Sequence, residues 1–223
     1  MLNTSKVLDT LRLDANGIFL KKYHVERTFD AFQVIEPSVT YTHVLNLYNT
    51  IESLLLNSYS GLKRVRILFT SLNEYSIQQE DLILNFEPIR LTLSKLTNQK
   101  YGLGLHNLKW QDRSFWDQLL LTKSEQSDDI VSLNMKGEVT ETSRFNIFFY
   151  NKNLDTVFTP PLESGCINGV YRRYVFENKK IELPQIGSKK IIEKNISISD
   201  LATFQIFVAN SVRGIMPAKI VNS

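Results

Sequence analysis

The feature that most constrains this chain is a stretch in which polar residues interrupt two strand-forming runs. It starts at Gly137 and reads Gly-Glu-Val-Thr-Glu-Thr-Ser-Arg-Phe-Asn-Ile-Phe, and Thr-Pro-Pro-Leu follows from Thr159. β-Forming residues at 147–150 precede a turn cluster at 151–153, so the pattern predicts a strand, a polar interruption and a second strand. A core hairpin would carry valine and isoleucine where this stretch carries charged, amide and hydroxyl side chains. Because buried polar groups need partners, we expect them to bind each other or a ligand.

The composition is that of an ordinary globular protein. The 223 residues are 43% hydrophobic and 22% charged, enough to bury a core in one large or two small domains. A net charge of +3 does not predict a nucleic-acid partner and leaves room for a small anionic substrate. The single Cys166 and three separated histidines predict neither a disulfide nor a metal site. No apolar run approaches the roughly 20 residues of a membrane span, so we expect a cytoplasmic protein without a membrane partner.

The order of elements predicts an α+β protein of two domains. In residues 1–100, a small domain, strands are expected over 7–13, 18–20, 64–70 and 77–86, with helices over 23–34 and from about 40 to 60. The predicted core face of the second helix consists of Val44, Leu47, Tyr48, Ile51, Leu54 and Leu55. Residues 101–108 are the expected linker, because Gly102 and Gly104 loosen an apolar run. Residues 109–223 form the expected strand-rich domain, with short helices over 112–121, 169–177 and 199–204.

Helix ends are also predicted in the second domain. We expect Ser127-Asp128-Asp129 to close the helix over 112–121, and Ser199 to be the N-cap of the last helix.

Two cationic residues stand in positions that allow chemistry. Arg27 lies near the start of the first helix, where the simpler interpretation is a solvated arginine. Lys109 follows an apolar, glycine-containing run and precedes Trp110. A desolvated lysine has a lowered pKa and becomes a Schiff-base nucleophile, although most such lysines only extend to solvent.

Two turns predict an anion-binding site. The first contains Asn168-Gly169-Val170-Tyr171 at the start of a helix, and the second contains Asn210-Ser211-Val212-Arg213-Gly214. Backbone N–H groups in such turns bind phosphate, most favourably at a helix N-terminus. Each turn alone is a weak signal, because loops of this composition are common.

Taken in this order and spacing, these motifs resemble the class IV, or fold type IV, family of pyridoxal-phosphate (PLP) enzymes. The resemblance runs from about Val7 to Ile220, with departures such as Asp9-Thr10 where glutamate-threonine is common. Within the family the motifs look most like the 4-amino-4-deoxychorismate lyase branch. The resemblance implies the family's fold, with a small N-terminal α/β domain and a strand-rich C-terminal domain.

The resemblance implies roles for individual residues. Lys109 would be the lysine that binds PLP, and Glu141 the carboxylate that faces its pyridine nitrogen. The phosphate would be bound by Arg27, the backbone N–H groups of Val170 and Tyr171, and Asn210 and Ser211. Arg113 and Asn146 would contact the ring or support the residues that do.

The implied reaction is elimination of pyruvate from 4-amino-4-deoxychorismate to give 4-aminobenzoate, a step of folate synthesis. Lys109 would move the proton, and Thr10 would protonate the leaving group unless it is a simple strand threonine. Arg213 and Arg66 would bind the two substrate carboxylates. The competing interpretation of Arg64 and Arg66 is an exposed strand face.

Two other functions remain open at this stage. A class IV aminotransferase acting on branched-chain or D-amino acids would share every cofactor residue. A binding module without catalysis would have no need of Lys109, Glu141 and Arg27. The resemblance also implies a homodimer, with aminodeoxychorismate synthase as a further partner.

Overall fold

The computed structural model describes residues 6–98 and 104–221, and the chain falls into two compact units. Unit 1 comprises Met1–Asn85, Leu108–Asp112 and Ser211–Arg213, and unit 2 comprises Phe86–Asn107, Arg113–Asn210 and Gly214–Ser223. The chain therefore divides after Asn85 and not at the expected linker, of which residues 101–103 lie outside the described residues.

Backbone hydrogen bonds explain the different boundary. Strand β5 (Ile89–Asn98) pairs in parallel with β6 (Asp129–Asn134) and β13 (Gly214–Ile220), which places it in the sheet of unit 2. The segment 108–112 joins unit 1 because the Leu8 amide donates to the Lys109 carbonyl at 3.1 Å and Trp110 forms a bridge with Val7. Lys109 thus belongs to the small unit, against the prediction that the second domain starts there.

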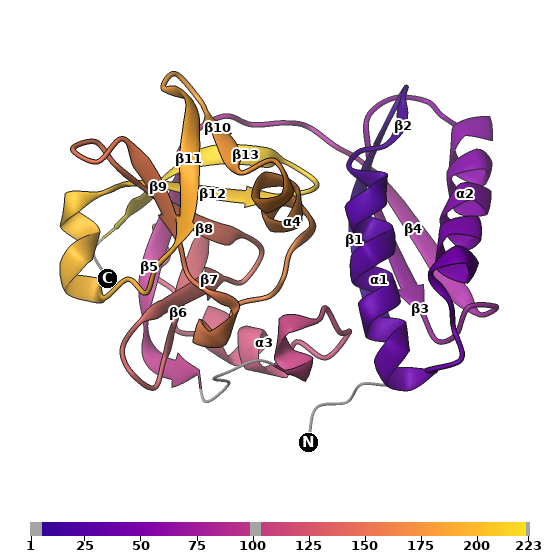
Figure 1. Ribbon diagram of the computed structural model, residues 1–223, viewed down its shortest axis with the longest axis horizontal. Helices are drawn as coiled ribbons and strands as arrows, with labels where there is room; N and C mark the ends of the chain where they lie inside the picture. The colour runs from indigo at the N-terminus through magenta and orange to yellow at the C-terminus, as the bar shows by residue number, and fades with distance from the viewer. Residues whose placement is uncertain (1–5, 99–103, 222–223) are drawn as a thin grey trace. The chain divides into compact units, whose positions relative to one another are not determined.

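Unit 1 contains an antiparallel sheet in the order β2-β1-β3-β4 (Figure 1). Its strands are β1 (Val7–Asp14), β2 (Gly17–Ile18), β3 (Lys63–Phe69) and β4 (Tyr75–Asp81). The predicted strand over 18–20 is shorter because Leu20 takes a left-handed conformation, with φ of 57°, where the first helix begins. The predicted strand over 77–86 begins and ends earlier than expected.

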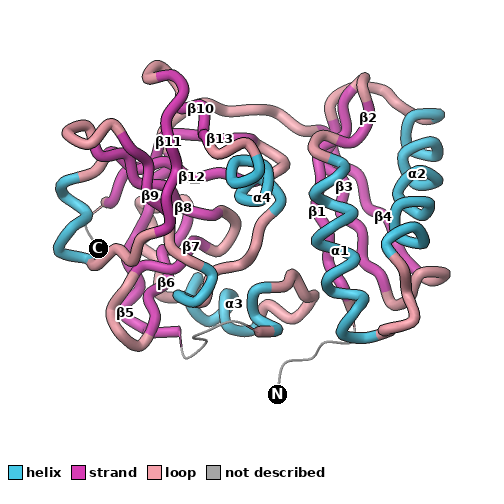
Figure 2. The backbone as a smooth tube through the Cα atoms, viewed as in Figure 1, coloured by secondary structure: helices cyan, strands magenta, loops and turns pink. Residues whose placement is uncertain are grey.

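Helices α1 (Lys21–Ile35) and α2 (Tyr41–Asn57) pack on the sheet of unit 1 (Figure 2). Glu36 ends α1, and Thr40 caps α2 by accepting a hydrogen bond from the His43 amide. The core between helices and sheet includes Phe32, Tyr48 and Phe69. The prediction that Leu54 shares this core is wrong: its side chain is 57% exposed, because at 3.6 residues per turn it falls to the side of the buried stripe.

Unit 2 contains a sheet in the order β10-β11-β9-β8-β12-β13-β5-β6-β7. The strands not yet given are β7 (Val139–Thr142), β8 (Asn146–Asn151), β9 (Thr156–Thr159), β10 (Lys180–Leu183), β11 (Gly187–Glu193) and β12 (Gln205–Asn210). The predicted strands on either side of the polar interruption are confirmed. They pair with different neighbours, β7 with β6 and β8 with β9 and β12. Of the interrupting polar residues, Ser143 and Arg144 lie in the loop between these two parts of the sheet, whereas Glu141 and Thr142 lie on β7 and Asn146 begins β8.

The helices of unit 2 are short. They are α3 (Ser114–Leu120), α4 (Val170–Glu177) and the 3-10 turns η1 (Leu105–Asn107), η2 (Leu162–Ser164) and η3 (Ile198–Thr203). The predicted helix over 169–177 is confirmed. The predicted N-cap at Ser199 is wrong, because Ser197 caps η3 in a capping box with Asp200. Asp129 does not close α3 but begins β6, fully buried.

Within residues 6–98 and 104–221, no helix is long and apolar enough to cross a membrane. The same residues contain no group of three or more His, Cys, Asp or Glu side chains that could hold a metal ion.

Candidate functional site

The predicted site residues divide between the two units. Unit 1 contains Thr10, Arg27, Arg66, Lys109, Ser211 and Arg213, and unit 2 contains Arg113, Glu141, Asn146, Val170, Tyr171 and Asn210.

In unit 2 the structure brings Glu141, Asn146 and the start of α4 together. Glu141 lies on β7 and is only 7% exposed. Asn146, the first residue of β8, directs its Nδ2 group to Glu141 Oε2 at 3.4 Å and to the Ile167 carbonyl at 3.0 Å. The Asn146 amide thereby joins a buried carboxylate to the turn that leads into α4.

Gly169 is the N-cap of α4 and lies in contact with that amide. A Cβ atom at this position would stand 2.2 Å from Asn146 Oδ1, so the close approach requires glycine. The first N–H groups of a helix have no partner within the helix, and together with the helix dipole they favour an anion. Val170 and Tyr171 are the first two residues of α4, so the residues of the predicted phosphate turn lie at a helix N-terminus.

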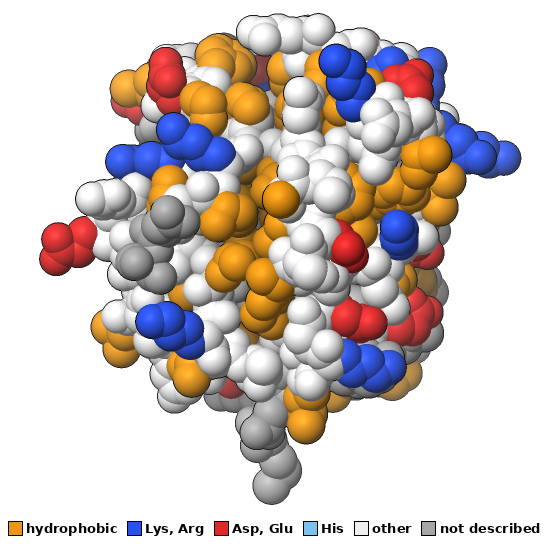
Figure 3. Space-filling view, turned by 90° about the vertical axis from the view of Figure 1, so that its left-hand side faces the viewer, with side chains coloured by type: hydrophobic (Ala, Val, Ile, Leu, Met, Phe, Trp, Pro, Cys, Tyr) orange, Lys and Arg blue, Asp and Glu red, His pale blue; other side chains and the backbone are white. Residues whose placement is uncertain are grey.

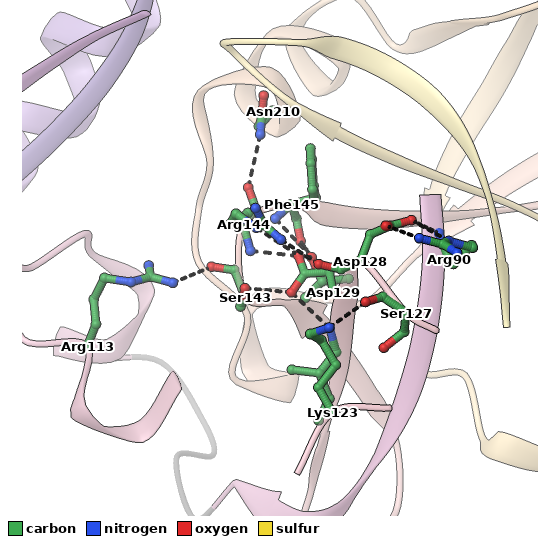
Figure 4. Close-up of polar contacts among 12 residues, drawn as sticks. Arg90, Arg113, Lys123, Ser127, Asp128, Asp129, Ser143, Arg144, Phe145 and Asn210 are labelled. Atoms are coloured by element: carbon green, nitrogen blue, oxygen red, sulfur yellow. Dashed lines mark hydrogen bonds and ion pairs between the residues drawn. The ribbon is translucent and has the colours of Figure 1, made fainter. Parts of the chain in front are cut away.

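The loop between β7 and β8 is held by the carboxylate of Asp129. Thr142 Oγ1 and Ser143 Oγ donate to this group at 3.0 and 2.5 Å, and Arg144 Nε lies 3.6 Å from it (Figure 4). Asp129 is fully buried at the start of β6. The sequence predicted Asp129 only as part of a helix end, because an aspartate is rarely fully buried and nothing in the local pattern marks this one.

Arg113 and Asn210 hold the same loop through its backbone. Arg113 Nη2 donates to the Ser143 carbonyl at 2.7 Å, and Asn210 Nδ2 donates to the Arg144 carbonyl at 3.1 Å (Figure 4). Burial lowers the pKa of Arg113 below its usual value, while the charges of Asp117 and Glu141 oppose that shift. In the described geometry both residues therefore support the loop that follows Glu141.

In unit 1, Arg27 is not the solvated arginine of the simpler interpretation. It is 5% exposed, and its Nη2 group is hydrogen-bonded to the fully buried Asp9 on β1. Asp9 also accepts a hydrogen bond from His24 Nδ1 at 2.7 Å and from the Tyr48 hydroxyl at 2.5 Å. Burial alone would raise the pKa of the Asp9 carboxyl, but His24, Arg27 and the more distant Lys109 hold it far below its usual range.

The opposite face of the unit 1 sheet carries Thr10 and Arg66. These residues are direct partners in the antiparallel pairing of β1 with β3, so their side chains lie on the same face. Ser211 Oγ donates to the Thr10 carbonyl at 3.3 Å, which attaches the second predicted turn to this strand. Arg213 Nη1, in the same turn, donates to the Ile83 carbonyl at 3.4 Å.

Arg64 and Arg12 form the next pair on that face. Arg64 is bound to Glu80 at 2.5 Å with both side chains well exposed, so the exposed-face interpretation holds for this arginine. Arg12, which the sequence analysis missed, is paired opposite Arg64 and stacks on Phe19 with its guanidinium carbon 3.7 Å from the ring centroid. Arg12 lies two residues after Thr10 on the predicted strand, so the sequence already indicated that both side chains lie on the same face of the sheet.

An apolar cavity of about 1010 Å³ lies elsewhere in unit 2, and Figure 3 shows hydrophobic side chains gathered along one face of the molecule. The walls of the cavity come from β12, β13, η3 and the turn before β11. Among the described residues that line it, only Lys219 is charged and none is a predicted site residue. Among its described lining residues, the cavity offers hydrophobic surface and, apart from the Lys219 amine, no acid, base or nucleophile.

Comparisons with known proteins agree with the geometry. The family model described as "Amino-transferase class IV" matches residues 6–221. No curated protein matches the sequence.

Solved structures share the fold. The branched-chain amino acid aminotransferase of Escherichia coli is 15% identical, with 99% of this chain and 79% of that chain covered and a TM-score of 0.77. The branched-chain aminotransferase of Thermoproteus uzoniensis is 19% identical, with 98% and 78% covered and a TM-score of 0.74. The 4-amino-4-deoxychorismate lyase of Pseudomonas aeruginosa is 17% identical, with 99% and 84% covered and a TM-score of 0.72. At these identities the likeness shows the fold alone.

Proposed function

This chain belongs to the class IV aminotransferase family, whose members are PLP-dependent, and we propose that within the family it is a 4-amino-4-deoxychorismate lyase. The proposed reaction releases 4-aminobenzoate and pyruvate. The observation that carries the proposal is the face of the unit 1 sheet on which Thr10 lies opposite Arg66, with the Ser211–Arg213 turn bound to Thr10. A substrate with two carboxylates needs more than one cation, and Arg12, Arg66 and Arg213 supply them.

The donor set suits PLP. Glu141 offers a buried carboxylate to a protonated pyridine nitrogen, and the α4 N-terminus and Arg27 offer N–H donors to a phosphate dianion. The missing Cβ of Gly169 lets the Asn146 side chain approach the N-terminus of α4 closely. When bound, PLP supplies an electron sink that acidifies the substrate carbon bearing the amino nitrogen.

The chain's own residues would do the rest. The Lys109 amine accepts the proton from that ring carbon, and the Thr10 hydroxyl donates a proton to the departing enolpyruvyl oxygen. Arg66 and Arg213 bind the carboxylates and orient the ring. Asp129, Arg113 and Asn210 keep the loop after Glu141 in one conformation.

A coupled assay tests the reaction. The purified protein is given chorismate, glutamine and an aminodeoxychorismate synthase, and 4-aminobenzoate is measured beside the formation of glutamate from an amino acid and 2-oxoglutarate. We expect 4-aminobenzoate that requires Lys109, with Lys109→Ala inactive. Glutamate without 4-aminobenzoate would make the protein an aminotransferase and overturn the proposal.

Substrate contacts are tested by substituting Arg66 on β3 and Arg213 in the second turn. Arg66→Ala and Arg213→Ala should raise KM about tenfold or more, as the loss of a charge-assisted contact to a carboxylate does. Arg64→Ala is the matched control, because Arg64 lies on the same strand as Arg66 and is bound to Glu80. An equal effect of all three would show that net charge alone governs KM.

We further propose that two copies assemble into a homodimer and that the protein acts in the cytoplasm beside aminodeoxychorismate synthase. The apolar surface around the unit 2 cavity supports self-association, because soluble monomers rarely leave large apolar patches in water. Light scattering at micromolar concentration should give twice the chain mass. A monomer would contradict the dimer without touching the chemistry.

A further inference from the structure

Asp9, to which the sequence assigned no role in the site, is the centre of a buried group of polar contacts. Its carboxylate accepts hydrogen bonds from four groups: the Thr10 amide at 2.8 Å, Arg27 Nη2, His24 Nδ1 at 2.7 Å and the Tyr48 hydroxyl at 2.5 Å. Asp9, His24 and Tyr48 are fully buried. A carboxylate has about four lone-pair sites, so the four donors use all of those on Asp9. They therefore hold the carboxylate group in one orientation.

Side chains from the two helices hydrogen-bond to the Asp9 oxygen that does not bind Arg27. The Tyr48 hydroxyl, from α2, donates its only proton to Asp9 and must therefore accept from Thr28 Oγ1, which lies 2.7 Å away. Burial lowers the pKa of His24 even though Asp9 raises it, so the imidazole is neutral near pH 7 and donates from Nδ1. Two neutral donors thus hold Asp9 Oδ2, while Oδ1 accepts from the Thr10 amide and from Arg27.

The contact with Asp9 uses only some of the N–H donors of the Arg27 guanidinium. An arginine has five N–H donors, and the described contact within unit 1 uses Nη2. The bidentate geometry that would occupy two parallel donors is absent from this described pair, because the other Asp9 oxygen is taken by His24 and Tyr48. The described contact therefore holds the guanidinium at Nη2 and compensates its charge, while Nε and Nη1 are not bound to Asp9.

We propose that Asp9 is a positioning residue that holds Arg27 for binding of a phosphate. The carboxylate sets the direction of the guanidinium before the ligand arrives, so the binding energy is not spent on ordering a long side chain. Asp9 itself does not touch the phosphate. The inference rests on the proposed phosphate-binding role of Arg27. It adds that this role depends on Asp9, which lies on β1 and is hydrogen-bonded by side chains from α1 and α2.

The test compares PLP with pyridoxal, which lacks the phosphate. Dissociation constants of both are measured on the cofactor-free protein for the wild type, Asp9→Asn, Arg27→Ala and the double variant. We expect Asp9→Asn to weaken PLP binding about tenfold, which corresponds to about 1.4 kcal/mol, and to change pyridoxal binding less than twofold. In the Arg27→Ala background, Asp9→Asn should cause no further loss, because Asp9 acts through Arg27.

A matched carboxylate and a gentler variant complete the experiment. Glu52→Gln breaks a partly buried pair with Lys21 in the same unit and should leave PLP affinity unchanged. If Asp9→Asn does not fold, Tyr48→Phe keeps the carboxylate and removes one of its donors, and should weaken PLP binding in the same direction by a smaller factor.

The outcomes separate the two proposals. An Arg27→Ala protein that binds PLP as tightly as the wild type would remove the phosphate role of Arg27, and the positioning role with it. If Arg27→Ala weakens binding, then unchanged or tighter binding in Asp9→Asn, an equal loss for pyridoxal, or additive losses in the double variant would overturn the positioning role alone.

Discussion

The Oδ1 atom of Asn146 lies 2.2 Å from the place where a Cβ atom on Gly169 would stand. The Asn146 side chain cannot withdraw freely, because its amide is bound to Ile167 and directed to Glu141. The contact joins the two sequence motifs of unit 2, and substitutions at either end should be coupled.

Gly169→Ala should therefore destabilise the protein by roughly 1–3 kcal/mol, the usual cost of forcing a methyl group into a packed position. Denaturant unfolding measures the loss. The same substitution in an Asn146→Ala background should cost less, because the clashing oxygen is gone. An equal loss of stability in both backgrounds would show that the strain does not come from the contact with the Asn146 oxygen.

Asp129→Asn should destabilise by about 1–3 kcal/mol, because the buried hydroxyls of Thr142 and Ser143 lose a charged acceptor. Its neighbour is the control: Asp128 forms an exposed pair with Arg90, and Asp128→Asn should cost less than about 1 kcal/mol. Similar losses from the two variants would contradict the role given to Asp129.

Glu141→Gln should keep PLP bound and lower turnover on the order of a hundredfold, because an amide cannot hold the pyridine nitrogen protonated. Visible absorption reports binding, and 4-aminobenzoate formation reports turnover. Glu138→Gln, in the turn before β7, is the control and should retain activity. Normal turnover in Glu141→Gln would show that the carboxylate does not face the ring.

The buried His24 makes stability depend on pH. Burial lowers its pKa in the folded state below the ordinary value of 6.5, so only the unfolded chain takes up this proton as the pH falls below that value. The free energy of unfolding should decrease toward pH 5, with a slope of up to about 1.4 kcal/mol per pH unit from this group. Asp9 adds a loss in the same direction only below its unfolded value of 3.8.

Urea unfolding at a series of pH values measures the slope. His24→Asn keeps a donor toward Asp9 but cannot be protonated, so the slope between pH 7 and 5 should become smaller. His43→Gln, at the exposed start of α2, should leave the slope as it is. The same slope in all three proteins would assign the effect to other groups.

The single cysteine provides a probe of unfolding. Burial raises the pKa of Cys166 to about 12, so the folded protein should not react with a thiol reagent at pH 8. Addition of urea should expose one reactive thiol per chain, with the same midpoint as fluorescence. Rapid labelling of the native protein would contradict the burial of this segment.

The sequence by itself determined the elements whose signals are local. The strands around Glu141 and the helix that begins after Gly169 could be predicted, because strand propensity, turn residues and helix caps act over a few positions. The tertiary structure decided what depends on distant pairing. β5 joined unit 2 through parallel pairing with β13, more than a hundred residues later in the chain. Asp9 and Arg27 became a buried pair because β1 and α1 pack together, and Asp129 reached Ser143 across the sheet. Burial of a charge depends on which partners the fold brings to it, and a linear pattern does not contain that information.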